Sequence, residues 1–146
     1  LNAHGANLEP LRRVAADAGL SCRLRSWWEF APVAALRREL YGDWEGMHAT
    51  PSEVAITQAV HRVVEREPMP APKKLTAEYI AAHSGDRHGP PEEHRRDFPD
   101  GRVGAWSELA RPEHGHRLLA LAAQAVAEDY LSFVSRSEDG PLSLGK

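Results

Sequence analysis

The chain has 146 residues, a length that suits one domain over 1–146 with a buried core. Its 18 Lys+Arg and 21 Asp+Glu give a net charge of −3, which argues against a nucleic-acid partner because such proteins present a basic face. The most apolar stretch, Leu118–Ala127, has about 10 residues where a bilayer needs ~20, so we expect no membrane partner. The single Cys22 rules out an intrachain disulfide and suits the cytoplasm.

The first third of the chain predicts an α/β sheet. Apolar spacing predicts a helix over 7–18 with Asn7 as its N-cap, and weak alternation over 20–28 predicts a strand. Leu1-Asn2 would then end a preceding strand, and residues from His4 onward would form the turn at its carboxyl end, where ligands of α/β sheets bind. Because the chain starts at Leu1 inside a polar segment, we expect a fragment that lacks upstream residues.

Two further helices are marked by their first and last residues. Pro32 at the start and Gly42 past the end predict a helix over 32–40. The segment Thr50-Pro51-Ser52-Glu53 has the pattern of a capping box and predicts a helix that runs to about Arg66.

The rest of the chain is a proline-rich segment followed by a long helix. Prolines between 68 and 104 leave little room for regular structure, apart from a short helix over 76–82. An apolar stripe predicts the last helix over 112–135, and we expect the tail after Arg136 to fray.

Histidines supply the candidate chemistry. His4, followed by a glycine that permits a tight turn, suits metal binding, and the alternative is a surface histidine beside a helix cap, because a lone histidine is a weak signal. We expect His48 and Glu53 to lie close together, so they could transfer protons or share a metal. For Glu53 the alternative is that a capping box requires a glutamate at this position.

Aromatic residues supply candidate contacts for a substrate. Trp44 lies in a glycine-flanked loop four residues before His48, where an indole could close over a small flat molecule. Trp27 and Trp28 would point to opposite faces of a strand. Ordinary packing is the alternative for each of these tryptophans.

Together these segments resemble the C-terminal portion of the creatininase (creatinine amidohydrolase) family. The resemblance is carried, in order, by LNAHGAN at 1–7, SWWEF at 26–30, GMHATPSEVAIT at 46–57, FPDGRVG at 98–104 and LARPEHG at 109–115. It implies a three-layer α/β/α sandwich, here without its N-terminal strands, and metal-dependent hydrolysis of amide-type C–N bonds. It also implies a cytoplasmic homo-oligomer, commonly a hexamer, with two zinc or manganese ions per site and iron as a further candidate.

The resemblance also implies roles for individual residues. His4 matches a metal ligand, His48 matches the histidine that shuttles a proton, and Trp28 and Trp44 match aromatic positions that cover the substrate. Some members place a metal-binding glutamate two residues after the first histidine, where this chain has Ala6, so Glu53 is the candidate carboxylate ligand. The family's first metal ligands lie on a segment that these residues do not include.

Three functions are compatible with these residues. The first is a creatininase-like amidohydrolase that acts on a small-molecule amide. The second is an inactive remnant or an interaction module with an incomplete metal site. The third keeps the fold and changes the bond, for example to a peptide or formamide C–N bond.

Overall fold

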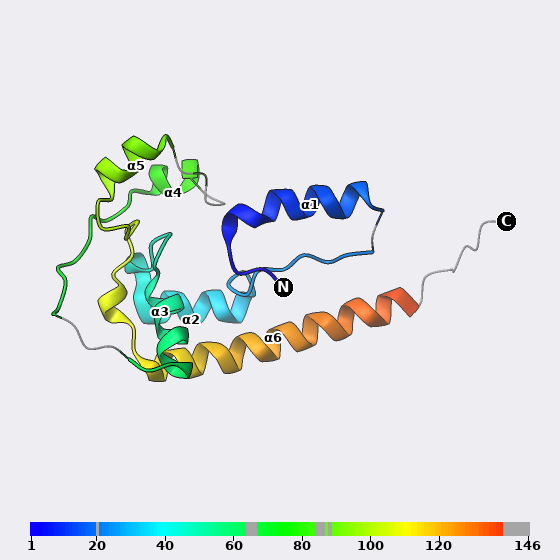
Figure 1. Cartoon of the computed structure of the whole chain (residues 1–146). Coiled ribbons are helices and arrows are strands. Elements are labelled where there is room, and N and C mark those ends of the chain that lie inside the picture. Colours follow the sequence, from blue (N-terminus) through cyan, green and yellow to red (C-terminus); the bar gives the residue numbers. More distant parts are fainter. Residues whose placement is uncertain (20, 64–66, 84–86, 88, 139–146) are drawn as a thin grey trace.

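The computed structural model of the chain describes residues 1–19, 21–63, 67–83, 87 and 89–138, and these residues are mostly helical. Figure 1 shows the arrangement of the helices. In chain order they are α1 (Leu8–Asp17), α2 (Ala31–Tyr41), α3 (Pro51–Val60), α4 (Ala77–His83), α5 (Pro91–Asp97) and α6 (Pro112–Glu138). Short 3₁₀ turns cover Gly5–Asn7, Gly42–Trp44 and Ser107–Leu109.

The predicted three-layer α/β/α sandwich is wrong, because the described residues contain no sheet. Their β-pairing is an isolated parallel bridge between Asn2 and Ser26, in which Asn2 N donates to Arg25 O at 2.7 Å. The predicted strand over 20–28 is therefore reduced to one bridge residue, with residue 20 outside the described part. The physical reason is that the chain turns after His4 into the 3₁₀ turn that precedes α1, so among the described residues the pairing beside Ser26 stays an isolated bridge at Asn2.

The helix limits predicted from local signals are confirmed at most ends. Pro32 lies in the first turn of α2 and Gly42 caps its end with a φ of +52°. The predicted capping box is present at the start of α3. This helix ends at Val60, earlier than the predicted Arg66, and residues 64–66 lie outside the described part.

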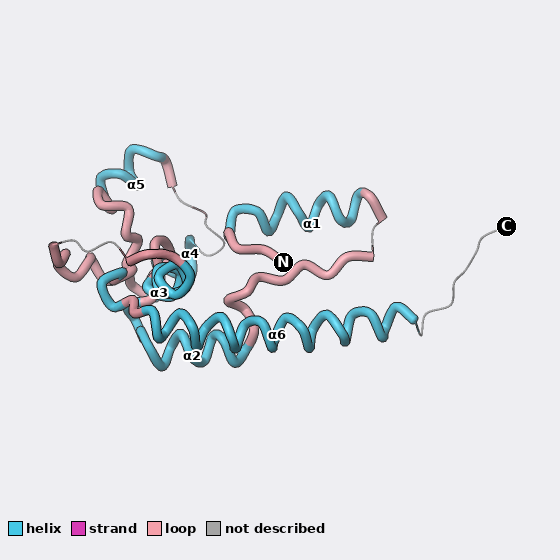
Figure 2. Tube along the Cα trace, turned by 60° about the horizontal axis from the view of Figure 1, so that its bottom comes forward, coloured by secondary structure: helices cyan, strands magenta, loops and turns pink. Residues whose placement is uncertain are grey.

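The hydrophobic core lies where α2 and α3 pack against the first half of α6, and Figure 2 shows α2 beside α6. Val33, Leu36, Tyr41 and Leu118 form a buried cluster. Gly115 lets α6 approach α3 closely, because a Cβ there would overlap the carbonyl group of Ala55. The core therefore fixes the position of α3.

The two ends of the fold carry exposed apolar side chains. Within α1, which has no buried residue, Leu11 and Val14 are 44% and 62% exposed. On the second half of α6, Tyr130 and Leu131 are 62% and 64% exposed. In both views an extended segment lies between α1 and α6 (Figures 1 and 2).

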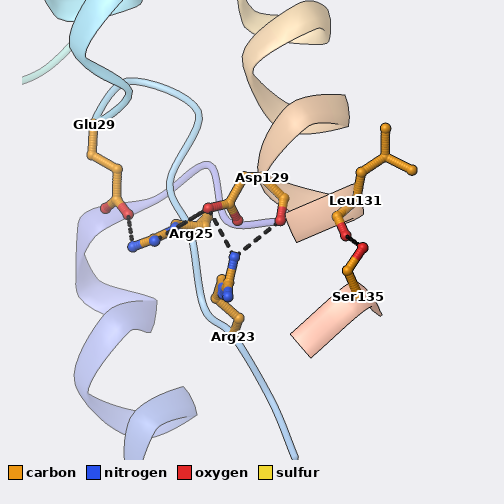
Figure 3. A network of polar contacts seen from close by, with 6 residues as sticks. All are labelled: Arg23, Arg25, Glu29, Asp129, Leu131 and Ser135. Atoms are coloured by element: carbon orange, nitrogen blue, oxygen red, sulfur yellow. Dashed lines mark hydrogen bonds and ion pairs between the residues drawn. The ribbon is translucent and has the colours of Figure 1, made fainter. Parts of the chain in front are cut away.

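Two arginines of that extended segment fasten it to α6 (Figure 3). Arg23 Nη1 donates to the main-chain carbonyl of Asp129 at 3.0 Å and to its carboxylate at 3.2 Å. Arg25 Nε and Nη2 donate to the same carboxylate oxygen, each at 3.2 Å. These ion pairs hold the segment that precedes Ser26 against α6, in place of the sheet pairing that the described residues lack.

The helix α6 is long and apolar enough over Pro112–Arg136 to cross a membrane by length and composition alone. This test is weak for a single helix, because a core helix of a soluble protein passes it too. In the most apolar window of α6, 17% of the residues are buried. The absence of a membrane partner stays a prediction.

Two short helices interrupt the proline-rich segment. The predicted helix over 76–82 is present as α4, while α5 was not predicted. The chain after α5 is anchored by the buried Arg102, which donates to Asp100 Oδ2 at 2.6 and 2.9 Å and to Pro70 O at 2.9 Å. The last helix is confirmed and runs to Glu138, and the tail from residue 139 lies outside the described part.

Candidate functional site

A pocket of about 230 Å³ lies between the N-terminal turn, the loop before α2 and the start of α3. Four of the five predicted site residues line it: His4, Trp28, His48 and Glu53. The rest of its wall is made by Ala3, Gly5, Leu8, Trp27, Arg37, Gly46, Met47 and Thr50. Segments far apart in the sequence therefore meet around one cavity.

His4 is positioned by the buried side chain of Asn2. The Asn2 side-chain amide donates to His4 O at 2.8 Å and to Ser26 Oγ at 3.2 Å, while His4 N donates to Asn2 Oδ1 at 3.4 Å. Asn2 is 4% exposed, so these bonds satisfy a polar group that has little access to water. Asn7 stands at the predicted N-cap position of α1, but its side chain makes no cap hydrogen bond.

His48 lies in a loop whose backbone is held by the segment before α6. Met47 N donates to Val103 O at 2.8 Å, and Ser107 Oγ donates to Ala49 O at 2.6 Å. Gly46 has a φ of +63°, and a Cβ there would lie 2.6 Å from Ala105 Cα. The exposed side chain of His48 is thus carried by a loop whose backbone is hydrogen-bonded to the segment before α6.

Glu53 both caps α3 and lines the pocket. Its Oε2 accepts hydrogen bonds from Thr50 N at 3.0 Å and from Thr50 Oγ1 at 2.9 Å. In return Glu53 N donates to Thr50 Oγ1 at 3.2 Å. The predicted capping box is therefore confirmed and uses one carboxylate oxygen of Glu53, while a further role of this residue in the pocket stays a prediction.

Of the three tryptophans in the predicted site region, Trp27 and Trp28 line the pocket and Trp44 does not. Trp27 and Trp28 meet edge to face with ring centroids 6.0 Å apart. Trp44 packs edge to face on Trp106 at 5.2 Å, and the ammonium of Lys74 lies 5.3 Å from its ring centroid. The structure therefore places Trp44 in a packing contact beside the loop of His48.

Arg37 comes from α2 and lines the pocket, although no sequence pattern marks it as a site residue. Its Nε and Nη2 contact Glu45 Oε1 at 2.9 and 2.8 Å, and its Nε lies 3.3 Å from Ser52 Oγ. Ser52 Oγ also donates to Glu45. The guanidinium carbon lies 5.5 Å from the ring centroid of Trp27.

The residues of the pocket do not form a metal centre by themselves. Among the residues that the structure describes, no group of three His, Cys, Asp or Glu could hold a metal ion. The side chain of Ala6 cannot coordinate a metal, and Glu53 spends one oxygen on its helix cap. Because a metal site in a protein ordinarily needs three or more such donors, these described residues do not complete a site by themselves, and the metal role of His4 and Glu53 stays a prediction.

A family model described as creatinine amidohydrolase, of the creatininase family, matches residues 1–130. The expectation that the chain is only the C-terminal portion of the family domain is not borne out by the position of this match. No curated protein matches the chain.

Proposed function

We propose, because the chain belongs to the creatininase family, that it hydrolyses an amide-type C–N bond of a small molecule bound in the pocket. The observation that carries this proposal is the convergence of His4, Trp28 and His48 around one cavity. A volume of about 230 Å³ lies just below the ~300–1,000 Å³ of typical ligand sites, which favours a compact substrate.

His48 is the group to which we assign proton transfer. In amide hydrolysis the C–N bond breaks, the hydroxyl of water joins the carbonyl carbon, and the leaving nitrogen takes a proton. An imidazole changes its protonation near neutral pH and is suited to that last transfer. The indole of Trp28 provides an apolar wall against which a flat substrate can lie.

The family is generally metal-dependent, and a metal would activate the attacking water. The described residues offer no three-donor group, so we assign no metal ligand and route no step through an ion. Zinc, manganese or iron as the metal therefore remains a prediction.

The test is hydrolysis of a panel of small cyclic and linear amides, followed by product detection in the presence and absence of Zn²⁺ and Mn²⁺. We expect His48→Gln to abolish turnover while the melting temperature stays unchanged. His61→Gln, a change at an exposed histidine beyond α3, is the matched control. Unchanged turnover in His48→Gln would remove His48 from the reaction.

The second candidate function is an interaction module without catalysis. It is favoured by the exposed apolar side chains of α1 and of the second half of α6, and by the lack of a metal-binding group among the described residues. Light scattering would show a stable oligomer, and no amide in the panel would be cleaved with any metal. Light scattering of the same preparation would test the predicted hexamer. Fractionation of cells would test the predicted cytoplasmic location.

A further inference from the structure

We propose that Arg37 positions the substrate by donating a hydrogen bond to its carbonyl oxygen. This inference rests on the proposed function, because it assigns a specificity role in the same pocket. It starts from the fact that Arg37 is the one lysine or arginine among the residues that line the described pocket.

The guanidinium of Arg37 is held in one orientation. Two of its nitrogens are taken by Glu45 Oε1, and its carbon lies over the ring of Trp27. Within the described part of the chain, Nη1 makes no hydrogen bond, so its two N–H groups remain for a ligand. A donor that is already oriented loses little freedom when it binds an acceptor.

The charge of the ion pair determines which acceptor fits. The side chains of Arg37 and Glu45 are 19% and 13% exposed, so the carboxylate neutralises the guanidinium in a largely desolvated setting. The carboxylate of Glu53 also lines the pocket and would repel an anion. The pocket therefore favours a neutral carbonyl group over a carboxylate.

If Arg37 had a purely structural role, its replacement would change the stability of the chain and would not change ligand binding in a variant that still folds. Glu45 Oε2 is buried without a partner in the described structure, so deletion of Arg37 would leave a buried charge unpaired and destabilise the chain. Arg37→Lys keeps a cation beside Glu45 and removes the Nη1 donor, which separates the two roles. Ser52→Ala perturbs the same network from a residue outside the pocket wall and is the matched control.

The experiment uses succinimide, a neutral cyclic imide, and succinate, a dianion, as probes of the full chain. Binding is followed by calorimetry and by the fluorescence of the pocket tryptophans, and folding by circular dichroism. We expect wild type to bind succinimide at least tenfold more tightly than succinate. Arg37→Lys should weaken succinimide binding at least tenfold, while Ser52→Ala should stay within about twofold, because one hydrogen bond to a charged donor is lost only in the former.

Three results would overturn the inference: wild type that does not bind succinimide, a stronger affinity for succinate, or unchanged binding in a folded Arg37→Lys variant. Failure of the proposed function is a separate result. If succinimide binds through Arg37 but no amide is hydrolysed, the pocket recognises carbonyl groups without catalysis. If amides are hydrolysed and Arg37→Lys leaves KM unchanged, only the role of Arg37 fails.

Discussion

Gly115 offers a test of the packing that positions the pocket, because two opposing effects meet there. In an ordinary helix interior, replacement of glycine by alanine adds about 1 kcal/mol of stability through helix propensity. In α6, however, a Cβ at position 115 would overlap the carbonyl oxygen of Ala55 and lie 2.9 Å from Ala59 Cβ. We therefore expect Gly115→Ala to destabilise the chain.

The structure indicates which effect is larger. Overpacking ordinarily costs about 1–3 kcal/mol, and this contact is at the upper end because the atoms it meets belong to the backbone of α3, which cannot rotate away. After subtraction of the propensity gain, the net loss is about 2 kcal/mol. For a chain of this size, about 4 °C of melting temperature accompanies each kcal/mol, so we expect a fall of about 8 °C.

Thermal unfolding followed by circular dichroism measures this difference. The matched control is Ser132→Ala on the exposed side of α6, where the gain in helix propensity is not opposed by a contact and should raise the melting temperature slightly. If Gly115→Ala melts at or above the wild-type temperature, the close crossing of α3 and α6 is not a feature of the folded chain. The position of Glu53 at the start of α3 would then need to be reconsidered.

Three further predictions concern the cap of α3, the phenol of Tyr41 and the helix α6. Thr50→Ala should lower the free energy of unfolding, measured in urea, by about 1 kcal/mol, because the helix cap is lost. Glu53→Gln should lower it by less, because the amide oxygen can still accept from Thr50 N. Equal losses in the two variants would contradict the capping geometry. Burial, reinforced by the Glu45 carboxylate and opposed by Arg111, raises the pKa of Tyr41 to about 12, so its contribution to stability is complete below pH ~10 and is lost as the pH rises toward 12. Absorbance titration should show a late-ionising phenol that disappears in Tyr41→Phe. Full-length chain should remain in the supernatant when mixed with lipid vesicles, because membrane insertion of α6 would bury Glu128 and Asp129 at about 2.5–3.5 kcal/mol for an acidic residue at mid-helix.

Helix ends can be predicted because their signals are local. The side chains of Thr50 and Glu53 satisfy backbone groups within the same turn, so the capping box needs no help from the rest of the fold. Gly42 likewise ends α2 through its own positive φ. For α5 the same kind of reasoning misleads, because a proline in the sequence suggests an interruption of regular structure. Pro91 instead occupies the first turn of the helix, where proline is tolerated.

Local signals are not enough to decide whether residues 20–28 form a strand, because strand pairing depends on residues outside the segment. Weak alternation over 20–28 is consistent with a strand, yet within the described part of the chain the segment pairs with Asn2 alone, in an isolated bridge. Instead, Arg23 and Arg25 anchor the segment to Asp129 more than a hundred residues away. Alternation states which side chains could share a face and does not supply a partner strand.

In the candidate site, too, residues in local motifs could be predicted from the sequence and residues defined by distant contacts could not. His4, His48 and Glu53 stand out in short motifs, and the structure brings all three to one pocket. Arg37 does not stand out in the sequence, because within α2 it is one of two adjacent arginines, and it is distinguished by contacts with Glu45 and Trp27 that only the fold brings together. Trp44 has a suggestive spacing from His48, but its backbone carbonyl accepts from Trp106 N at 2.9 Å and its ring packs on the same residue.

The loop that carries His48 depends on the last third of the chain. Val103 O accepts from Met47 N, and Ser107 Oγ donates to the carbonyl of Ala49, which itself has an unfavourable φ of +53°. A non-glycine residue in that conformation persists only where its surroundings fix it. The short segment between α5 and α6 therefore supports the loop that carries His48. Substitutions at Val103 or Ser107 should shift this loop, and with it the wall of the pocket, although neither residue lines the pocket.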